Sequence, residues 1–277
     1  MPETTIVLDM GKSVEANASA FFQLAKGHSA RAEKIRAAIA DAEKKIRSLE
    51  KKRPEAGKRK ALAKRERNWY ERFHWFFTSE NLLVIAGRDR HSNEAVIKKH
   101  MDENDLFFHA DIQGAAHCVL KCGSKAPGEA SKNEAALFAA VFSKAWQYGH
   151  SSADVYSALP EQVKKSAPSG ESISTGAFMV YGKREWYRGI QMDFAIGVKM
   201  ENDTASVVSG PNSAVSGHSD FFLKVMQGKL SKSQAAKDIK KRFHSFYKGK
   251  AEIALDEIIA MLPSDGIQLD PGQKRNV

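Results

Sequence analysis

Two short segments place basic residues where they could hold phosphate groups. The first is Gly87-Arg88-Asp89-Arg90, which follows an apolar run and lies just before Asn93. Asp89 or Ser92 could cap a helix that runs to about Lys99, so the pattern predicts a helix N-terminus beside two guanidinium groups. Free N–H groups at a helix N-terminus and nearby arginines suit phosphate binding. We therefore expect Arg88, Arg90 and Asn93 to face a phosphate-bearing ligand.

The second segment alternates cations with aromatic rings. It runs Gly182-Lys183-Arg184-Glu185-Trp186-Tyr187-Arg188. Cations that contact phosphate and rings that stack on bases are the combination that single-stranded RNA recognition requires. An equally good interpretation is a β-turn that places Trp186 in the core. The sequence leaves both open, and we expect Lys183, Arg184 and Trp186 to contact RNA if the first holds.

His109 and Asp111 are two residues apart in an apparent strand, so alternation puts them on one face. Such a pair could perform acid–base chemistry on RNA, or could simply contact it, and no recognisable nucleophile accompanies it. Cys118 and Cys122 lie close by, but a structural zinc site needs four ligands and no second cysteine pair exists. Buried core cysteines are the better interpretation, and we expect neither a metal nor a cofactor.

Gly11-Lys12-Ser13 follows a β-prone run, where a phosphate-binding P-loop would end. The first glycine of that loop should stand five residues earlier, and Ile6 occupies the position. Without that glycine the loop cannot wrap phosphates with backbone N–H groups, which excludes nucleoside triphosphate binding here.

The charge of the chain is concentrated in two stretches. The 277 residues contain 43 Lys and Arg against 33 Asp and Glu, a net charge of +10. Residues 31–67 hold 15 basic and 6 acidic residues, and residues 224–250 hold 9 basic residues and only Asp238. Clustering of this kind is typical of proteins that bind polyanions. The 15 Phe and 4 Trp exclude a wholly disordered chain, and no apolar run is long enough for a membrane span.

A heptad pattern extends from Val14 to Leu49 and predicts a long coiled-coil helix. Pro54 and Gly57 break it, and Leu62, Trp69, Phe73 and Phe76 then predict a second helix over about residues 58–77. We expect an antiparallel hairpin. The basic residues at its tip are Lys51, Lys52, Arg53, Lys58, Arg59 and Lys60.

The first arm of this hairpin is the longer, so its base near Phe21 and Phe22 lacks a partner within the hairpin. Residues 79–277 alternate strand-like runs with apolar helices. The expected fold is therefore α+β: a long antiparallel coiled-coil helical hairpin over residues 1–78, attached to a mixed α/β globular domain over residues 79–277.

Several segments, taken in order, resemble a known domain. They are residues 69–76 (WYERFHWF), 83–89 (LVIAGRD), 108–115 (FHADIQGA), 167–171 (APSGE) and 174–180 (STGAFMV), followed by Gly182-Lys183-Arg184 and Gly210-Pro211. This series resembles the NFACT-R domain of the NEMF/RqcH (NFACT) family, especially its archaeal members. Residues 8–18 and the helices after them resemble the coiled-coil middle region of that family.

The resemblance implies a role in ribosome-associated quality control. Members of the family bind obstructed large ribosomal subunits and tRNA, and promote untemplated C-terminal tailing of stalled chains. We therefore expect a cytoplasmic RNA-binding protein, not an enzyme, whose partners are large-subunit rRNA and tRNA and which does not bind membranes. The chain shows no NFACT-N region, so a separate NFACT-N-type protein is a further expected partner.

Two alternatives stay open at this point. One is an enzyme that acts on RNA through His109 and Asp111, and the other is a hairpin that docks an acidic protein. The residues expected to contact RNA are Lys51, Lys52, Arg53, Lys58, Arg59, Lys60, Arg88, Arg90, Asn93, His109, Asp111, Lys183, Arg184 and Trp186.

Overall fold

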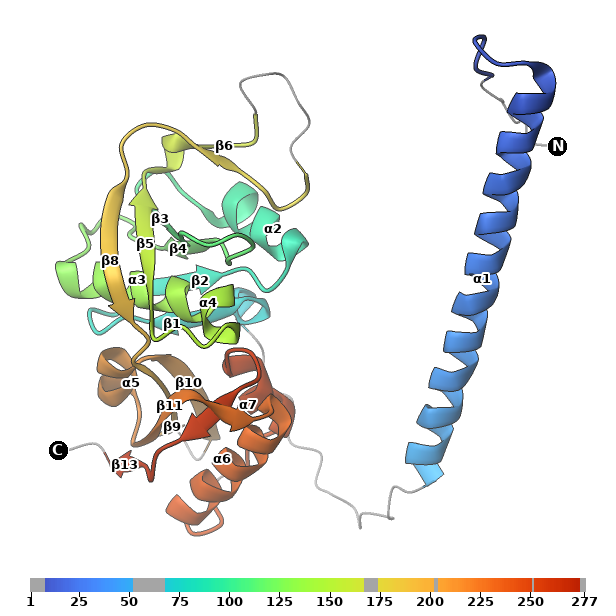
Figure 1. The fold of residues 1–277 in the computed structure, drawn as a ribbon. Coiled ribbons are helices and arrows are strands. Elements are labelled where there is room, and N and C mark those ends of the chain that lie inside the picture. The colour runs from blue at the N-terminus through green and yellow to red at the C-terminus, as the bar shows by residue number, and fades with distance from the viewer. Residues whose placement is uncertain (1–7, 52–67, 167–173, 202–203, 251, 275–277) are drawn as a thin grey trace. The chain divides into compact units, whose positions relative to one another are not determined.

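The computed structural model describes residues 8–51, 68–166, 174–201, 204–250 and 252–274 (Figure 1). The chain divides into two compact units, Met1–Glu66 and Arg67–Val277. We describe each unit by itself.

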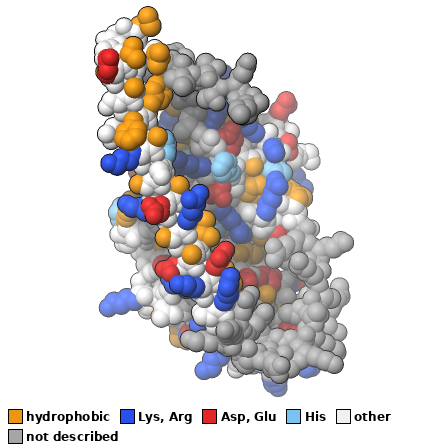
Figure 2. Space-filling view, turned by 90° about the vertical axis from the view of Figure 1, so that its right-hand side faces the viewer, with side chains coloured by type: hydrophobic (Ala, Val, Ile, Leu, Met, Phe, Trp, Pro, Cys, Tyr) orange, Lys and Arg blue, Asp and Glu red, His pale blue; other side chains and the backbone are white. Residues whose placement is uncertain are grey.

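The first unit contains one long helix, α1 (Val14–Lys51), as the heptad pattern predicts. Asn17 joins the preceding turn to this helix: its Nδ2 donates to the carbonyl oxygens of Asp9 and Ser13, and its Oδ1 accepts from the Asp9 N–H. Figure 2 shows hydrophobic side chains gathered near the N-terminal end of α1 and mixed charges along the rest. Among the described residues of this unit, the large hydrophobic side chains that are exposed are Leu8, Met10, Val14, Phe21, Phe22, Leu24, Ile35, Ile39 and Ile46.

The prediction that a second helix forms the other arm of the hairpin is wrong over the part that the structure describes. Trp69–Arg72 form a single 3-10 turn, η1, and His74–Phe77 form strand β1. Phe73 and Phe76 belong to separate hydrophobic clusters. Their spacing fits a helix, but aromatic residues also favour strands, and pairing with the next strand decides the outcome. The rest of this arm, and the side chains of the six basic tip residues, lie outside the described residues.

The second unit begins with a six-stranded antiparallel sheet in the order β1-β2-β4-β3-β5-β8. Its further strands are β2 (Leu83–Ala86), β3 (Leu106–Ala110), β4 (Cys118–Leu120), β5 (Ser152–Ala158) and β8 (Glu185–Gln191). Helix α2 (Arg90–His100) packs on one face, where Val96 and Ile97 meet Ile85 and Phe107. Helix α3 (Glu129–Val141) packs on the other face.

A second antiparallel sheet follows, in the order β10-β9-β11-β12, with β13 beside β11. The strands are β9 (Phe194–Glu201), β10 (Thr204–Pro211), β11 (Phe221–Leu230), β12 (Ile267–Leu269) and β13 (Gln273–Lys274). The helices that pack around it are α5 (Asn212–His218), α6 (Lys232–Phe246) and α7 (Leu255–Met261). Phe138 of α3 lies 6.4 Å from Phe194 of β9, ring to ring, so one core joins the two sheets.

Short elements complete the unit: α4 (Lys144–Gln147), the 3-10 turn η2 (Pro160–Gln162), and strands β6 (Val163–Lys164) and β7 (Met179–Val180), which pair with each other. The expected α+β class, with a long N-terminal helix and a mixed globular domain, is confirmed. Strands and helices alternate along residues 79–277, as expected.

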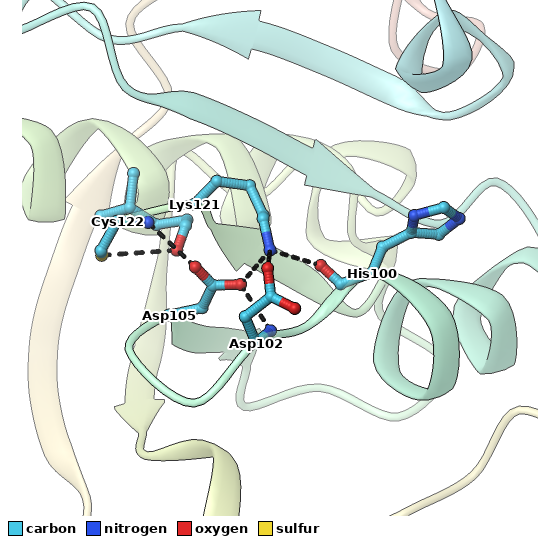
Figure 3. A network of polar contacts seen from close by, with 6 residues as sticks. His100, Asp102, Asp105, Lys121 and Cys122 are labelled. Carbon is cyan, nitrogen blue, oxygen red and sulfur yellow. Dashed lines mark hydrogen bonds and ion pairs between the residues drawn. The ribbon is translucent and has the colours of Figure 1, made fainter. Parts of the chain in front are cut away.

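A buried ion pair closes the loop between α2 and β3 against the end of β4 (Figure 3). Lys121 Nζ donates to the carboxylates of Asp105 and Asp102 and to the carbonyl oxygen of His100. Asp105 is 1% exposed, and its Oδ1 accepts the N–H of Cys122 at 2.9 Å. This network anchors the start of β3 to the end of β4.

Replacing Asp105 with Asn should lower the free energy of unfolding by about 3 kcal/mol, because it leaves the lysine without its buried partner. Asp102→Asn is the matched control, since Asp102 contacts the same lysine but its side chain is 81% exposed. We expect that change to cost less than about 1 kcal/mol. Urea denaturation measures both, and equal losses would contradict the assignment of the buried pair as the anchor.

Candidate nucleic-acid interface

A cavity of about 770 Å³ opens between one edge of the first sheet and the start of α6. Its walls come from the end of β2 and the start of α2, from β3 and the turn that follows it, from α4, from residues 174–178, and from the start of α6. Arg88, Arg90, Asn93 and His109 all line it. The structure thus brings together four of the residues that the sequence singles out.

Contact between Gly87 and Asn93 sets the geometry of the cavity entrance. A Cβ atom at Gly87 would lie 2.6 Å from the Asn93 nitrogen and 2.7 Å from its Cα, so only glycine fits. The Asn93 side-chain oxygen accepts the N–H of His117 at 3.0 Å, and Gly87 N–H donates to the His117 carbonyl oxygen. Asn93 therefore fixes the junction between β2, α2 and the start of β4.

Capping interactions position the two arginines. The Asp89 side chain accepts the Ser92 N–H at 2.8 Å and so caps α2. The Arg88 N–H donates to Ser92 Oγ, and the Arg88 guanidinium donates to the carbonyl oxygen of Phe73 at 2.8 Å. Arg90 is exposed in the first turn of the helix. As predicted, the helix begins between the two guanidinium groups.

The wall formed by residues 174–178 is held by Glu94. The Gly176 N–H donates to Glu94 Oε2, and Lys165 joins Glu94 to the carbonyl oxygens of Ser174 and Ala177. The ion pair with Lys98, together with these contacts, lowers the pKa of Glu94 to about 2. Glu94 is therefore committed to structure and does not neutralise the cavity.

Basic side chains outnumber carboxylates among the residues that line the cavity. Arg88, Arg90, Lys144 and Lys232 line it, and among the described lining residues Asp89 is the only carboxylate. Burial and the charge of Arg88 lower the pKa of Lys232, although nearby Asp265 opposes this. Burial and the charges of Arg88 and Lys232 also lower the pKa of His74 well below its ordinary value. An anion in the cavity would relieve this repulsion.

Two histidines in the wall are neutral at physiological pH. Burial lowers the pKa of His109 to about 4, and burial with the neighbouring His109 lowers that of His117 to about 3. Their rings are 5.3 Å apart. In the part of the chain that the structure describes, no hydrogen bond joins His109 to Asp111, which is exposed beyond the end of β3.

A row of aromatic rings extends from His109 across three strands. His109 pairs with Tyr156 of β5, which pairs with Trp186 of β8. The Arg184 guanidinium lies 4.5 Å from the centre of the Tyr156 ring, and that of Arg188 lies 3.9 Å from Trp186. Trp186 is 37% exposed, so the interpretation that places it in the core is wrong. We call the three rings of His109, Tyr156 and Trp186, together with Arg184 and Arg188, the aromatic row.

The remaining expected residues are dispersed. Lys183 is exposed, and its carbonyl oxygen accepts a hydrogen bond from Gln162. The tip residues Lys51, Lys52, Arg53, Lys58, Arg59 and Lys60 lie outside the part whose side chains are described. Whether any expected residue contacts RNA stays a prediction.

Sequence reasoning missed Lys144 and Lys232 as cavity residues. Lys144 follows the N-cap Ser143 of α4, and its side chain lies 3.2 Å from where a Cβ of Gly114 would be. Gly114 has φ +77°, which favours glycine. The charge count of residues 224–250 included Lys232 but gave no reason to place it near Arg88. Only the tertiary fold brings these lysines to the arginines.

Cys118 and Cys122 are free and buried. Burial raises the pKa of Cys122 to about 11. No group of three His, Cys, Asp or Glu side chains in the described ranges could hold a metal ion. Among the helices of those ranges, none has the length and apolar character that crossing a membrane would need.

A cationic cavity beside an aromatic row is typical of a protein that binds nucleic acid, because such proteins combine phosphate contacts with base stacking. Residues 72–182 match the family described as the NFACT protein RNA binding domain. These residues include most of the cavity and part of the aromatic row.

Whole-chain comparisons agree. The chain is 33% identical over 210 residues to the archaeal Rqc2 homolog aRqcH of Methanocaldococcus jannaschii. The matched region covers 76% of this chain and 30% of that protein. It is 36% identical over 162 residues to the ribosome quality control complex subunit NEMF of Homo sapiens, covering 56% of this chain and 15% of that one.

A solved structure, the C-terminal part of the fibronectin/fibrinogen-binding protein from Streptococcus suis, is also similar, with 20% identity and a TM-score of 0.37 over 49% of this chain and 51% of that one. The chain belongs to the NFACT family, and its curated relatives are ribosome quality control proteins. It spans 30% of the archaeal relative and 15% of the human one.

Gly87→Ala should lower the free energy of unfolding by about 2 kcal/mol, because the new methyl group meets the backbone of Asn93. Gly217→Ala is the control, since nothing lies within 4 Å of its would-be Cβ and it lies within α5. We expect that change to be neutral or to stabilise by about 0.5 kcal/mol. Thermal and urea unfolding distinguish the two, and a well-tolerated Gly87→Ala would refute the contact.

Acidification should destabilise the protein, because His109 and His117 bind protons more readily when unfolded. Their contribution to stability is complete above an ordinary histidine pKa of about 6.5 and is lost as the pH falls toward the folded values. Within that window, the proton uptake of each histidine on unfolding should reduce the free energy of unfolding by up to about 1.4 kcal/mol for each pH unit of acidification.

The variant His117→Phe retains an aromatic ring and removes one titrating group. Its free energy of unfolding, measured in urea at a series of pH values, should depend less steeply on pH than that of the wild type. Parallel pH profiles for the two proteins would show that His117 is not the group responsible.

Proposed function

We propose that this protein acts in ribosome quality control in the cytoplasm by binding RNA, namely the rRNA of obstructed large ribosomal subunits and tRNA. The observation that supports this most is the cavity, whose described lining residues include four cations and one carboxylate. That carboxylate, Asp89, caps helix α2. The names of the curated relatives support a role in ribosome quality control, and the cationic lining of the cavity supports phosphate binding.

The cavity suits an RNA phosphate. Arg88 and Arg90 flank the first turn of α2, whose N–H groups favour an anion. Lys144 and Lys232 approach from α4 and α6. Two arginines, two lysines and a helix N-terminus from three separate elements converge on one space, which supports a phosphate as the group held there.

The aromatic row suits an unpaired base. Trp186 is partly exposed, and two guanidinium groups lie over neighbouring rings. Because His109 belongs to both the cavity wall and the row, one nucleotide strand could place its phosphate in the cavity and a base along the row. This arrangement favours single-stranded RNA over a duplex.

Binding is better supported than catalysis. A histidine with a pKa of about 4 exchanges protons poorly near pH 7, where general acid–base catalysts work best. Asp111 is exposed and does not orient the His109 ring. We therefore propose that the chain is not an enzyme and that any support for C-terminal tailing comes through bound tRNA.

The exposed hydrophobic face of α1 supports a further partner. Phe21 is 43% and Phe22 68% exposed. We propose that an NFACT-N-type protein or region covers this face and that the basic tip contacts rRNA. If the hairpin instead docks an acidic protein, its capture from an extract will survive nuclease treatment.

Filter binding across a salt series tests the proposed function. Arg90→Gln/Lys144→Gln removes two exposed cations from the cavity and should reduce the slope of log affinity against log salt for single-stranded RNA by about 1.4. Affinity for large ribosomal subunits and for tRNA should fall as well.

The control is Lys99→Gln/Lys125→Gln, which removes two exposed lysines that do not line the cavity. It makes the same change in net charge. Equal slopes for the two variants would mean that overall charge and not the cavity binds RNA.

A further inference from the structure

Helix α6 presents a basic face outside the region that matches the RNA-binding domain. Ala235, Ala236, Ile239 and Phe243 are buried against the second sheet and α7. Lys237, Lys240 and Lys241 are exposed on the opposite side, because residues three and four apart share one face of a helix. Figure 1 shows α6 packed along this sheet.

Among the described residues, some lysines of the same unit are paired with carboxylates, and these three are not. Lys98, Lys121, Lys132 and Lys165 each form an ion pair with a carboxylate. Within the described ranges, Lys237, Lys240 and Lys241 form none. The one acidic side chain of the helix, Asp238, is engaged with Arg242 at 2.7 Å. The α6 face therefore presents uncompensated positive charge.

A hollow of about 400 Å³ adjoins this face. Its lining residues are Phe221, Asp238, Lys241, Arg242, Ser245 and Phe246. The rings of Phe221 and Phe246 are stacked, with centroids 4.8 Å apart and an interplanar angle of 14°. Arg242 also donates to the Asp270 carbonyl oxygen, so it is held in place beside them. Lys241 belongs both to the basic face and to the hollow.

We propose that Lys237, Lys240 and Lys241, with the hollow beside Phe246, form a second binding surface for single-stranded RNA, distinct from the cavity at the start of α2. Lysines in a row contact successive phosphates, and the aromatic hollow takes a base. An acidic protein would use the lysines but not the stacked rings. The proposal rests on the proposed function in taking RNA as the ligand, but it does not require the cavity.

The test uses the full chain and a fluorescent single-stranded oligouridine. Lys237→Gln/Lys240→Gln/Lys241→Gln should reduce the slope of log affinity against log salt by about 2. The matched control, Lys99→Gln/Lys125→Gln/Lys164→Gln, removes three exposed lysines located elsewhere. The proposal predicts a clearly smaller change for the control, and equal changes would overturn it.

Phe246→Leu tests the aromatic part, with an expected loss of roughly tenfold in affinity for oligouridine and none for polyglutamate. If polyglutamate displaces the RNA and Phe246→Leu has no effect, the surface binds acidic protein and the proposal fails. The lysine variants test it even if Phe246→Leu misfolds.

Adding the α6 substitutions to Arg90→Gln/Lys144→Gln separates this inference from the proposed function. A further loss of slope supports a distinct surface, even if the cavity variant alone has no effect. The absence of any further loss would contradict it.

Discussion

The close contact between Gly87 and Asn93 is the constraint on which the rest of the site depends. It forces the end of β2 against the first turn of α2, and through His117 it holds the start of β4 at the same point. The two arginines flank that contact, so their positions follow from backbone packing. The distance between a strand end and a helix start thus determines where positive charge gathers.

The acidic residues around the site are used for structure. Asp89 caps α2, Glu94 ties down residues 174–178, and Asp105 anchors the loop that leads into β3. Each has its own hydrogen-bond partners within the fold. A globular domain of nearly balanced charge, with 25 Lys and Arg against 23 Asp and Glu over residues 79–277, can therefore present a cationic cavity. What matters for an anionic ligand is where the charges lie and not their total.

Local patterns predicted local features well. The heptad seam predicted α1, and the two candidate caps Asp89 and Ser92 predicted the start of α2, where Asp89 is the cap. Both signals lie within a few residues of their effect. The aromatic run at residues 69–77 led to a wrong prediction of a helix, because its spacing suits either a helix or a strand. Pairing with β2 makes residues 74–77 a strand. Lys144 and Lys232 could not have been found, because they join the arginines only through the packing of distant elements.

The central claim is that RNA enters the cavity at the start of α2 and lies along the aromatic row. Ultraviolet cross-linking of the full chain to tRNA and to large ribosomal subunits, followed by peptide mapping, tests it most directly. The account predicts cross-links in the peptides that contain His109–His117, Ser174–Phe178 and Trp186. Efficient cross-linking elsewhere in the chain, with none in these peptides, would contradict it.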